Sequence, residues 1–356
     1  MADELRIAHE DLVGLVSQTL AGEGMRSPGR FFEADVMVEA DLLGVPSHGI
    51  RTLPMVVRAL REGRATANPE IKFLRDRSAC CVIDGDNGTG RSVSVQAMQF
   101  AVDRAKKFGV GVCLANRVTH WGRAHAYAFR AAQNSCVGIC TTNAIPNMVA
   151  WNSTHPLLGN NPLAIGIPRG GQNPVVLDMA MSQAAVGKVG TYQREGKTMP
   201  PNWGLDADGN PTSDPAAILA SRRMLPFGDH KGTGLAVMME LLTGALVGGL
   251  LSQEMVKQDS TGLDADSTKL FIALDVQSYV KPERLAQRID DLLMYLREAE
   301  PGLEITFPGD RGWQTRERYL AEGIPIHPEI VEQLKAIGVD LPSVARSSIP
   351  RQGGIA

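Results

Sequence analysis

The chain has 356 residues, 44% hydrophobic and 21% charged, and its 36 lysines and arginines against 39 aspartates and glutamates leave a formal net charge of −3. This near-neutral balance lacks the dense positive field that dominates nucleic-acid binding, and the apolar fraction excludes a disordered chain. No run approaches the roughly 18 consecutive apolar residues of a membrane helix, and the first residues do not resemble a signal peptide. We therefore expect a globular, cytoplasmic protein that binds neither nucleic acid nor membrane.

The N-terminal region has the residue spacing of helices. Apolar residues recur at helical intervals from Leu12 to Leu20, from Phe32 to Leu43 and from Leu53 to Leu60. The Ser-Pro pair at 27–28 has the pattern of an N-cap followed by a first-turn proline. The third helix is expected to begin near Ser47.

From residue 71 onward the pattern alternates between strands and helices, which predicts an α/β core with helices covering a sheet. Strands are expected at 71–74, 80–84, 110–115, 137–142, 163–167, 175–179, 270–276 and 303–307. Helices are expected around 98–105, 229–247 and 285–296. The segment 190–225 is dense in turn-forming residues and is expected to be a long surface excursion, with a lid over a site as one of its roles. The last residues, 351–356, are expected to form a frayed tail.

The cysteines and histidines do not have the spacing of a metal site. The chain has 5 cysteines, an odd number without a C-x-x-C pair, which favours buried, reduced, structural thiols. Its 7 histidines include no H-x-x-x-H or H-E-x-x-H pair. No metal is expected.

Three short polar segments are candidates for chemistry, although the Rossmann fingerprint G-x-G-x-x-G and the P-loop are absent. If Ser47 caps a helix, then His48, Arg51 and Thr52 project from one face and could bind an anion and move a proton. The alternative is an exposed, solvated helix start. The glycine-rich segment 228–234 opens a helix and is either a phosphate site or a simple turn.

The third candidate is Asp178, which ends the strand predicted at 175–179. Ligands of α/β sheets bind at the carboxyl ends of strands, so its carboxylate could contact one. The alternative is a helix cap for a segment beginning near Ser182.

Together these motifs resemble the malate/L-lactate dehydrogenase family, which includes ureidoglycolate and sulfolactate dehydrogenases, diketogulonate reductase and Δ1-piperideine-2-carboxylate reductase. The resemblance covers nearly the whole chain. It rests on the segments 47–50, 53–54, 84–90, 119–122, 159–162, 176–180, 206–215 and 230–232. It implies a mixed-sheet α/β core that binds nicotinamide without a Rossmann fold. The implied organisation is a helical substrate-side region at 1–70, a nicotinamide-binding domain at 71–310, and C-terminal helices with a tail at 311–356 that return to the N-terminal region.

The family's reaction is a reversible hydride transfer between C2 of a 2-hydroxy acid and NAD, with NADP as the alternative. By this resemblance His48, oriented by Ser47, or else His120, exchanges the proton of the substrate oxygen. The implied cofactor contacts are His120, Trp121, Gly122, Thr142, Asp178, Met179, Ala180, His230, Lys231, Pro308, Gly309 and Asp310.

The chain departs from the family pattern at positions that the resemblance assigns to the substrate. Thr52 stands where many members have a carboxylate-binding arginine, and Arg51 lies one position earlier. Asn160 replaces a threonine that some members use on the substrate. Lys188 lies beside the implied catalytic pair, where imine-reducing members carry an acidic residue. The lysine favours a hydroxy-acid dehydrogenase over a ketimine reductase.

The resemblance also implies a homodimer that acts on a small 2-hydroxy or 2-oxo acid. A ketimine reductase, a non-catalytic dinucleotide-binding protein and a metal-dependent hydrolase are the alternatives. Which hydroxy acid is the substrate does not follow from the residues.

Overall fold

The computed structural model describes residues 5–256, 263, 265–299 and 302–341, so the tail predicted at 351–356 lies outside the described residues. The chain divides into two compact units, one made of Met1–Asn68 with Asp310–Ala356 and the other of Pro69–Gly309. Within the described ranges, no helix combines the length and the apolar character that crossing a membrane requires.

The first unit is mainly helical. Its helices are α1 (His9–Gly22), α2 (Gly29–Leu42), α3 (Leu53–Arg61), α11 (Asp310–Glu322) and α12 (Pro328–Lys335). Strand β1 (Leu5–Ile7) pairs antiparallel with β13 (Ile324–Ile326), which joins the two ends of the chain within this unit. Residues Leu12, Val16 and Leu20, which follow the predicted helical spacing, are buried in its core together with Ile324 and Ile326.

The segment between α2 and α3 differs from the prediction. Instead of a helix starting near Ser47, the chain forms two 3-10 turns, Pro46–His48 and Ile50–Thr52, and α3 begins at Leu53. Gly49 separates the turns with an extended backbone, φ −85 and ψ −150. The helical spacing that placed His48, Arg51 and Thr52 on one face therefore does not apply. Likewise, Pro28 is the N-cap of α2 and not its first residue.

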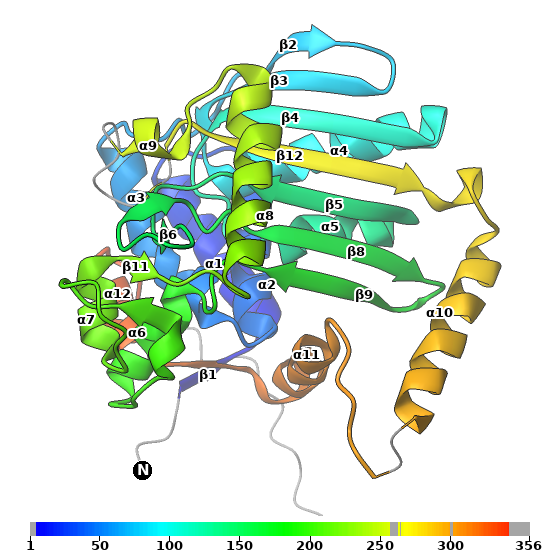
Figure 1. Cartoon of the computed structure of the whole chain (residues 1–356). Coiled ribbons are helices and arrows are strands. Elements are labelled where there is room, and N and C mark those ends of the chain that lie inside the picture. Colours follow the sequence, from blue (N-terminus) through cyan, green and yellow to red (C-terminus); the bar gives the residue numbers. More distant parts are fainter. Residues whose placement is uncertain (1–4, 257–262, 264, 300–301, 342–356) are drawn as a thin grey trace, which may run out of the picture. The chain divides into compact units, whose positions relative to one another are not determined.

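The second unit is built on a mixed 7-stranded sheet with the order β2-β3-β4-β12-β5-β8-β9 (Figure 1). The strands are β2 (Lys72–Asp76), β3 (Cys80–Gly88), β4 (Val110–Val118), β5 (Cys136–Thr142), β8 (Leu163–Arg169), β9 (Gln172–Met179) and β12 (Ser267–Asp275). Strands β3 and β4 are parallel, and the other neighbouring pairs are antiparallel. This arrangement confirms the predicted α/β class with a mixed sheet. The strand predicted at 303–307 is not formed, and this segment has no regular structure.

Helices cover both faces of this sheet. On one face α4 (Gly90–Phe108) packs against β4 and β12, and α5 (His125–Gln133) packs against β5 and β8. On the other face α8 (His230–Glu240) and the π-helical turn Leu241–Ala245 run across the strands, as Figure 1 shows. Helix α10 (Pro282–Glu298) contacts β8, and the short α9 (Ser252–Met255) follows the π turn.

The segment predicted to be a surface excursion, 190–225, contributes to a buried core that it shares with residues outside it. It contains the end of α6 (Val186–Arg194), the 3-10 turn Pro201–Trp203 and α7 (Pro215–Ser221). Its strands β10 (Gly204–Leu205) and β11 (Arg223–Met224) join β6 (Met148–Val149) and β7 (Pro156–Leu158) in a 4-stranded sheet. The prediction of a loop was wrong because the methionines and other apolar side chains, spaced among turn residues, form a buried cluster. Its members are Met148, Met181, Ala184, Val189, Met199, Ile218, Met224, Ala236 and Met239.

The cysteines are unpaired thiols, as expected, but one of them is not buried. Cys81, Cys113, Cys136 and Cys140 are buried in the sheet, whereas Cys80 is exposed. Cys80 opens β3, where side chains alternate between the two faces, so its neighbour Cys81 takes the inward position. Within the described ranges, no group of three or more His, Cys, Asp or Glu side chains is placed to hold a metal ion.

Candidate active site

The candidate site residues of the second unit gather at one edge of the 7-stranded sheet. The strand registers bring five strand termini next to one another. In order across the sheet they are the end of β4, the start of β12, the end of β5, the start of β8 and the end of β9. Several predicted residues therefore lie at or just beyond this edge: His120, Trp121, Gly122, Thr142, Asn160, Asp178, Met179 and Ala180. The sequence predicts that some of these residues lie near the ends of strands, and the pairing of the strands places those ends next to one another.

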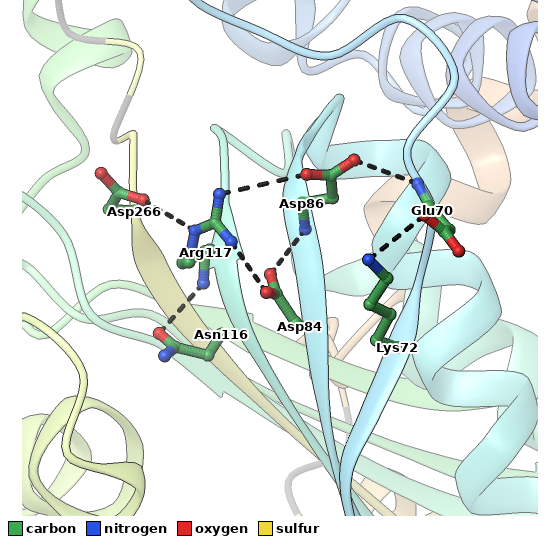
Figure 2. A network of polar contacts seen from close by, with 7 residues as sticks. All are labelled: Glu70, Lys72, Asp84, Asp86, Asn116, Arg117 and Asp266. Carbon is green, nitrogen blue, oxygen red and sulfur yellow. Dashed lines mark hydrogen bonds and ion pairs between the residues drawn. The ribbon is translucent and has the colours of Figure 1, made fainter.

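An ion-pair network centred on Arg117 joins three strand ends at this edge (Figure 2). Its guanidinium lies 2.7 Å from Asp84, 4.0 Å from Asp86 and 3.8 Å from Asp266. Arg117 adopts a left-handed backbone conformation, φ 55, which is uncommon for a residue with a side chain and often marks a constrained site. The network thereby fixes the end of β4, from which His120 follows.

His120 is held by its backbone and by one ring nitrogen. Its amide donates to the carbonyl of Leu263 at 2.6 Å, and the preceding Thr119 donates through its amide and its hydroxyl to the carbonyl of Gly88. The amide of Gly122 donates to Nδ1 of His120 at 3.2 Å. Nδ1 is therefore the acceptor nitrogen, and Nε2 carries the hydrogen of the neutral ring.

Close packing around this segment requires glycine at two positions. A Cβ atom on Gly90 would lie 2.2 Å from the carbonyl oxygen of His120. Gly122 has φ 74, and a Cβ atom there would lie 2.7 Å from Nε of the buried Arg91. The side chain of Trp121 is only 3% exposed and stacks on Tyr127, so this residue contributes to the core rather than offering its ring to a ligand.

The end of β9 carries a carboxylate with a cationic partner. Asp178 accepts a hydrogen bond from Nε of Arg123 at 2.6 Å, and both side chains are largely buried. Helix α6 begins only at Val186, so Asp178 is not the helix cap that was its alternative role. The pair joins the segment after His120 to the residues at the end of β9.

The start of α8 lies next to the chain that follows β9. A Cβ atom on Gly232 would approach the carbonyl oxygen of Met181 to 2.6 Å, which places His230 and Lys231 close to the end of β9. The His230 ring lies against Trp151, with 5.5 Å between ring centroids. The amides of residues 231–233 donate to carbonyls of the same turn. These three amides are therefore used within the turn, and the phosphate site that was one of the two predictions for this segment would have to use other groups.

The other predicted residues of this unit have distinct surroundings. The amide of Asn160 donates to Asn147 at 2.9 Å, and its carbonyl accepts from Met181. The Lys188 ammonium lies over the ring of Trp203, 4.7 Å from its centroid. The Pro308 carbonyl accepts from the amide of Val176 in β9. Gly309 ends this unit, and Asp310 is the first residue of α11 in the other.

In the first unit, the turn that carries His48 is shaped by a buried carboxylate. Asp41, 4% exposed, accepts the amide of Ile50 at 2.7 Å. A Cβ atom on Gly49 would lie 2.1 Å from the Asp41 oxygens, so only glycine fits there. Ser47 Oγ lies 3.0 Å from Nδ1 of the half-buried His48. The two side chains that the prediction paired are therefore within hydrogen-bond distance of each other.

The next residues of the turn are Arg51 and Thr52. Both are half-buried, and the Thr52 hydroxyl donates to the Gly49 carbonyl at 2.7 Å. This bond uses the donor hydrogen of Thr52, so its hydroxyl could offer a ligand only an acceptor. Arg51 is the cation of this turn.

Comparison with known proteins identifies the family. A family model described as malate/L-lactate dehydrogenase matches residues 7–335. The chain belongs to the malate/L-lactate dehydrogenase family. This confirms the resemblance seen in the sequence and the expectation of an oxidoreductase.

Relatives in this family have different substrates in their names. L-sulfolactate dehydrogenase from Methanocaldococcus jannaschii is 35% identical, over 91% of this chain and 93% of its own. The Δ1-pyrroline-2-carboxylate/Δ1-piperideine-2-carboxylate reductase of Pseudomonas syringae pv. tomato is 33% identical, over 85% of this chain and 89% of its own. The crystal structure of malate dehydrogenase from Entamoeba histolytica superposes with a TM-score of 0.89 at 27% identity, covering 98% of this chain and 100% of that one.

Several residues that shape the site were not predicted from the sequence. Arg117, Arg123 and Glu240 contact residues that are distant in the chain, and Asp41 contacts the turn that follows α2. One of them has a signal in the sequence. Glu240 is the only charged residue between Lys231 and Glu254, and a single charge in an apolar helix commonly has a buried partner.

Proposed function

We propose that the protein oxidises a small 2-hydroxy acid to the 2-oxo acid, and catalyses the reverse reduction, with His48 as the proton-exchanging group. Family membership supports the reaction class, since relatives include enzymes named for malate and for sulfolactate. The observation that carries the proposal is the different hydrogen bonding of the two histidines. This difference supports the assignment of a separate role to each histidine.

His48 has a partner that suits both protonation states. A serine hydroxyl can accept a hydrogen bond or donate one, so Ser47 Oγ, 3.0 Å from Nδ1, can accept from Nδ1–H throughout the reaction. Nε2 is then the nitrogen that gives its proton to the carbonyl oxygen in reduction and takes it back in oxidation. An imidazole held in this way can move a proton near neutral pH.

His120 has a partner that suits only one state. The Gly122 amide always donates, so a proton on Nδ1 of His120 would face another hydrogen at 3.2 Å. With Nδ1 accepting from this amide, Nε2 carries the ring hydrogen and acts as a hydrogen-bond donor. Such a donor can orient the substrate oxygen or a carboxamide without exchanging a proton.

The substrate carboxylate needs a cation. We assign Arg51 as this group because a guanidinium binds a carboxylate through two parallel hydrogen bonds. Asn160 is the proposed polar contact at the start of β8, and Thr52 is a weaker candidate because its hydroxyl already donates to Gly49. Arg51→Ala should raise KM for the acid, and an unchanged KM would show that another group binds the carboxylate.

The residues of the second unit fit a nicotinamide cofactor in their donor chemistry. His120 offers a neutral donor, and the exposed His230 and Lys231 supply donors and a cation at the start of α8. The bound nicotinamide would supply or accept the hydride. Asp178, Met179, Ala180 and Thr142 at the sheet edge are the other proposed contacts, while Pro308 to Asp310 are retained from the family resemblance. We propose NAD as the cofactor, and rates with NADH and NADPH test this choice.

The second candidate function is reduction of a cyclic ketimine, because the Pseudomonas relative is named for that reaction. Against it stands Lys188, whose ammonium is engaged with the Trp203 ring where imine-reducing members are expected to carry an acidic group. We therefore propose that Lys188 acts as a cation that disfavours a cationic imine. Faster reduction of Δ1-piperideine-2-carboxylate than of any 2-oxo acid would reverse this choice.

The central experiment compares matched glutamine variants of the two histidines with a panel of 2-oxo acids and NADH. His48→Gln should lower kcat about 10²- to 10⁴-fold, the usual contribution of a proton-transfer group. His120→Gln keeps a neutral donor and should cost less. The acidic group in the pH profile of kcat should disappear only in His48→Gln. If the acidic group disappears only in His120→Gln, the roles of the two histidines are reversed. If the wild-type protein reduces none of the 2-oxo acids in the panel, the proposed dehydrogenase activity is refuted.

We also propose that the protein is a homodimer. The exposed face of α8 and its π turn supports this, since it has large apolar side chains at Leu235, Met238, Leu241, Leu242 and Leu246. Between Leu235 and Leu246 the only charged residue is Glu240, which is buried, so two copies can meet across a twofold axis at this part of the face without like-charge repulsion. Light scattering should show a dimer that Met238→Lys converts to a monomer.

The buried free thiols support a cytoplasmic location.

A further inference from the structure

Helix α8 carries a buried carboxylate that has no part in the proton transfer proposed above. Glu240 is 6% exposed and lies at the end of the helix, where the π turn begins. Burying a charge is costly unless hydrogen bonds replace its water. The residues around the Glu240 carboxylate supply the hydrogen bonds that replace this water.

The Glu240 carboxylate accepts hydrogen bonds from three residues. Oε1 accepts from Nδ2 of Asn143 at 3.3 Å and from the amide of Ser252 at 2.7 Å. Oε2 accepts from Nδ2 of Asn161 at 2.9 Å and from Oγ of Ser252 at 2.6 Å. These partners belong to the loop after β5, the turn before β8 and helix α9.

The two asparagine side chains are oriented by their other bonds. Oδ1 of Asn143 accepts the amide of Thr268 at 2.9 Å, and Oδ1 of Asn161 accepts the amide of Ala144 at 3.1 Å. Each carboxamide therefore turns its nitrogen toward Glu240. The group between them must accept on both sides, which a carboxylate does and a carboxamide does not.

The π turn brings this group into place. A Cβ atom on Gly244 within the turn would lie 2.9 Å from Nδ2 of Asn143 and 2.5 Å from the carbonyl oxygen of Leu250. A π turn of this kind, inserted in an α-helix, is frequent at functional sites. Here the glycine in the turn allows the helix to approach Asn143 closely.

Each asparagine is adjacent to a residue of the candidate site. Asn143 follows Thr142 at the end of β5, and Asn161 follows Asn160 before β8. Asn161 has φ 27, a left-handed conformation that its side-chain bonds help to hold. Moving either carboxamide would move the neighbouring site residue with it.

We propose that Glu240 is a positioning residue, whose carboxylate holds Thr142 and Asn160 in the geometry for binding cofactor and substrate. The inference rests on the proposed function for the roles of Thr142 and Asn160. Glu240 itself touches neither ligand and exchanges no proton.

The test is Glu240→Gln, with Glu254→Gln as the matched control. Both variants make the same chemical change, but Glu254 is exposed and accepts a hydrogen bond from the amide of Leu251 at 2.8 Å. Glu240→Gln places an NH2 group against two donors. We expect KM for the 2-oxo acid and Kd for NADH to rise about 10-fold or more, as for other groups that orient ligand-binding residues. The pH profile of kcat should keep its shape, and Glu254→Gln should stay within about twofold of wild type.

A folded Glu240→Gln protein with wild-type KM and Kd would overturn the proposal, even if its thermal stability fell. If Glu240→Gln does not fold, Ser252→Ala removes one donor from Oε2 and should raise the same constants less, about 2- to 5-fold. Unchanged constants in a folded Ser252→Ala protein would then refute the proposal. Hydrogen exchange at the amides of Ala144 and Thr268 is read without turnover. If the wild-type protein reduces no 2-oxo acid but Glu240→Gln still exchanges these amides faster than wild type, the proposed function fails while the positioning role of Glu240 stands. If exchange is unchanged, the positioning role fails as well.

Discussion

The substitution Gly49→Ala tests how the turn that carries His48 is held. Gly49 has an extended backbone that any residue can adopt, so the cost of alanine is purely steric. Its Cβ atom would lie 2.1 Å from both carboxylate oxygens of Asp41, and Asp41 is 4% exposed. The carboxylate must move and give up its 2.7 Å hydrogen bond from Ile50. Overpacking costs about 1–3 kcal/mol, and losing a hydrogen bond to a buried charge costs about 1.5–3 kcal/mol.

We therefore expect Gly49→Ala to lower the free energy of unfolding by about 3–5 kcal/mol. The matched control is Gly14→Ala in α1, where no atom lies within 4 Å of the added Cβ and alanine should stabilise the helix by about 0.5–1 kcal/mol. Urea denaturation followed by circular dichroism measures both changes, and kcat measures the displacement of His48. A Gly49→Ala protein as stable as Gly14→Ala would refute the role of Asp41 in this turn.

Three further predictions concern separate groups. Burial lowers the pKa of His9 below its ordinary value of 6.5, so the unfolded chain binds the proton more readily; stability should fall as the pH drops through this value, and less steeply in His9→Gln. Cys80 should react with a thiol reagent in the native protein, while burial raises the pKa of Cys140 and should keep it unreactive until the chain unfolds. Asp178→Asn should raise Kd for NADH about 10-fold by loosening Arg123, whereas Asp290→Asn, which breaks the equally short pair with Arg169, should leave it unchanged.

The sequence was sufficient for the parts of the fold that depend on local spacing. Helices α1, α4 and α10 and the hairpin of β2 and β3 follow from apolar periodicity and turn residues. The turn at 46–52 did not follow, because Asp41, outside the segment, fixes its backbone at Gly49. The predicted strand at 303–307 has the alternation of a strand, but this segment pairs with no strand in the described part of the chain. The spacing of residues predicts which secondary structure a segment favours, but contacts with distant residues determine whether it forms.

The candidate site also has a part that the sequence predicts and a part that depends on tertiary contacts. The motifs gave His48, His120 and Asp178, since these residues stand out beside glycines or at a strand end. They left the roles of the two histidines open, and the roles that we propose rest on whether Nδ1 contacts the hydroxyl of Ser47 or the amide of Gly122. That distinction is one of atoms and not of residue types.

The two kinds of charged group at the site should respond differently to salt. Arg117 is 47% exposed and acts through ion pairs that mobile ions screen. Glu240 is 6% exposed, and its partners among the described residues are neutral N–H and O–H groups, which added salt does not neutralise. Disruption of the Arg117 network by Arg117→Gln should therefore raise Kd for NADH less at 0.5 M salt than at 0.05 M, a range across which the screening length falls severalfold. The effect of Glu240→Gln should be the same at both concentrations. An equal salt response in the two variants would mean that Glu240 depends on long-range charge and not on the direction of its hydrogen bonds.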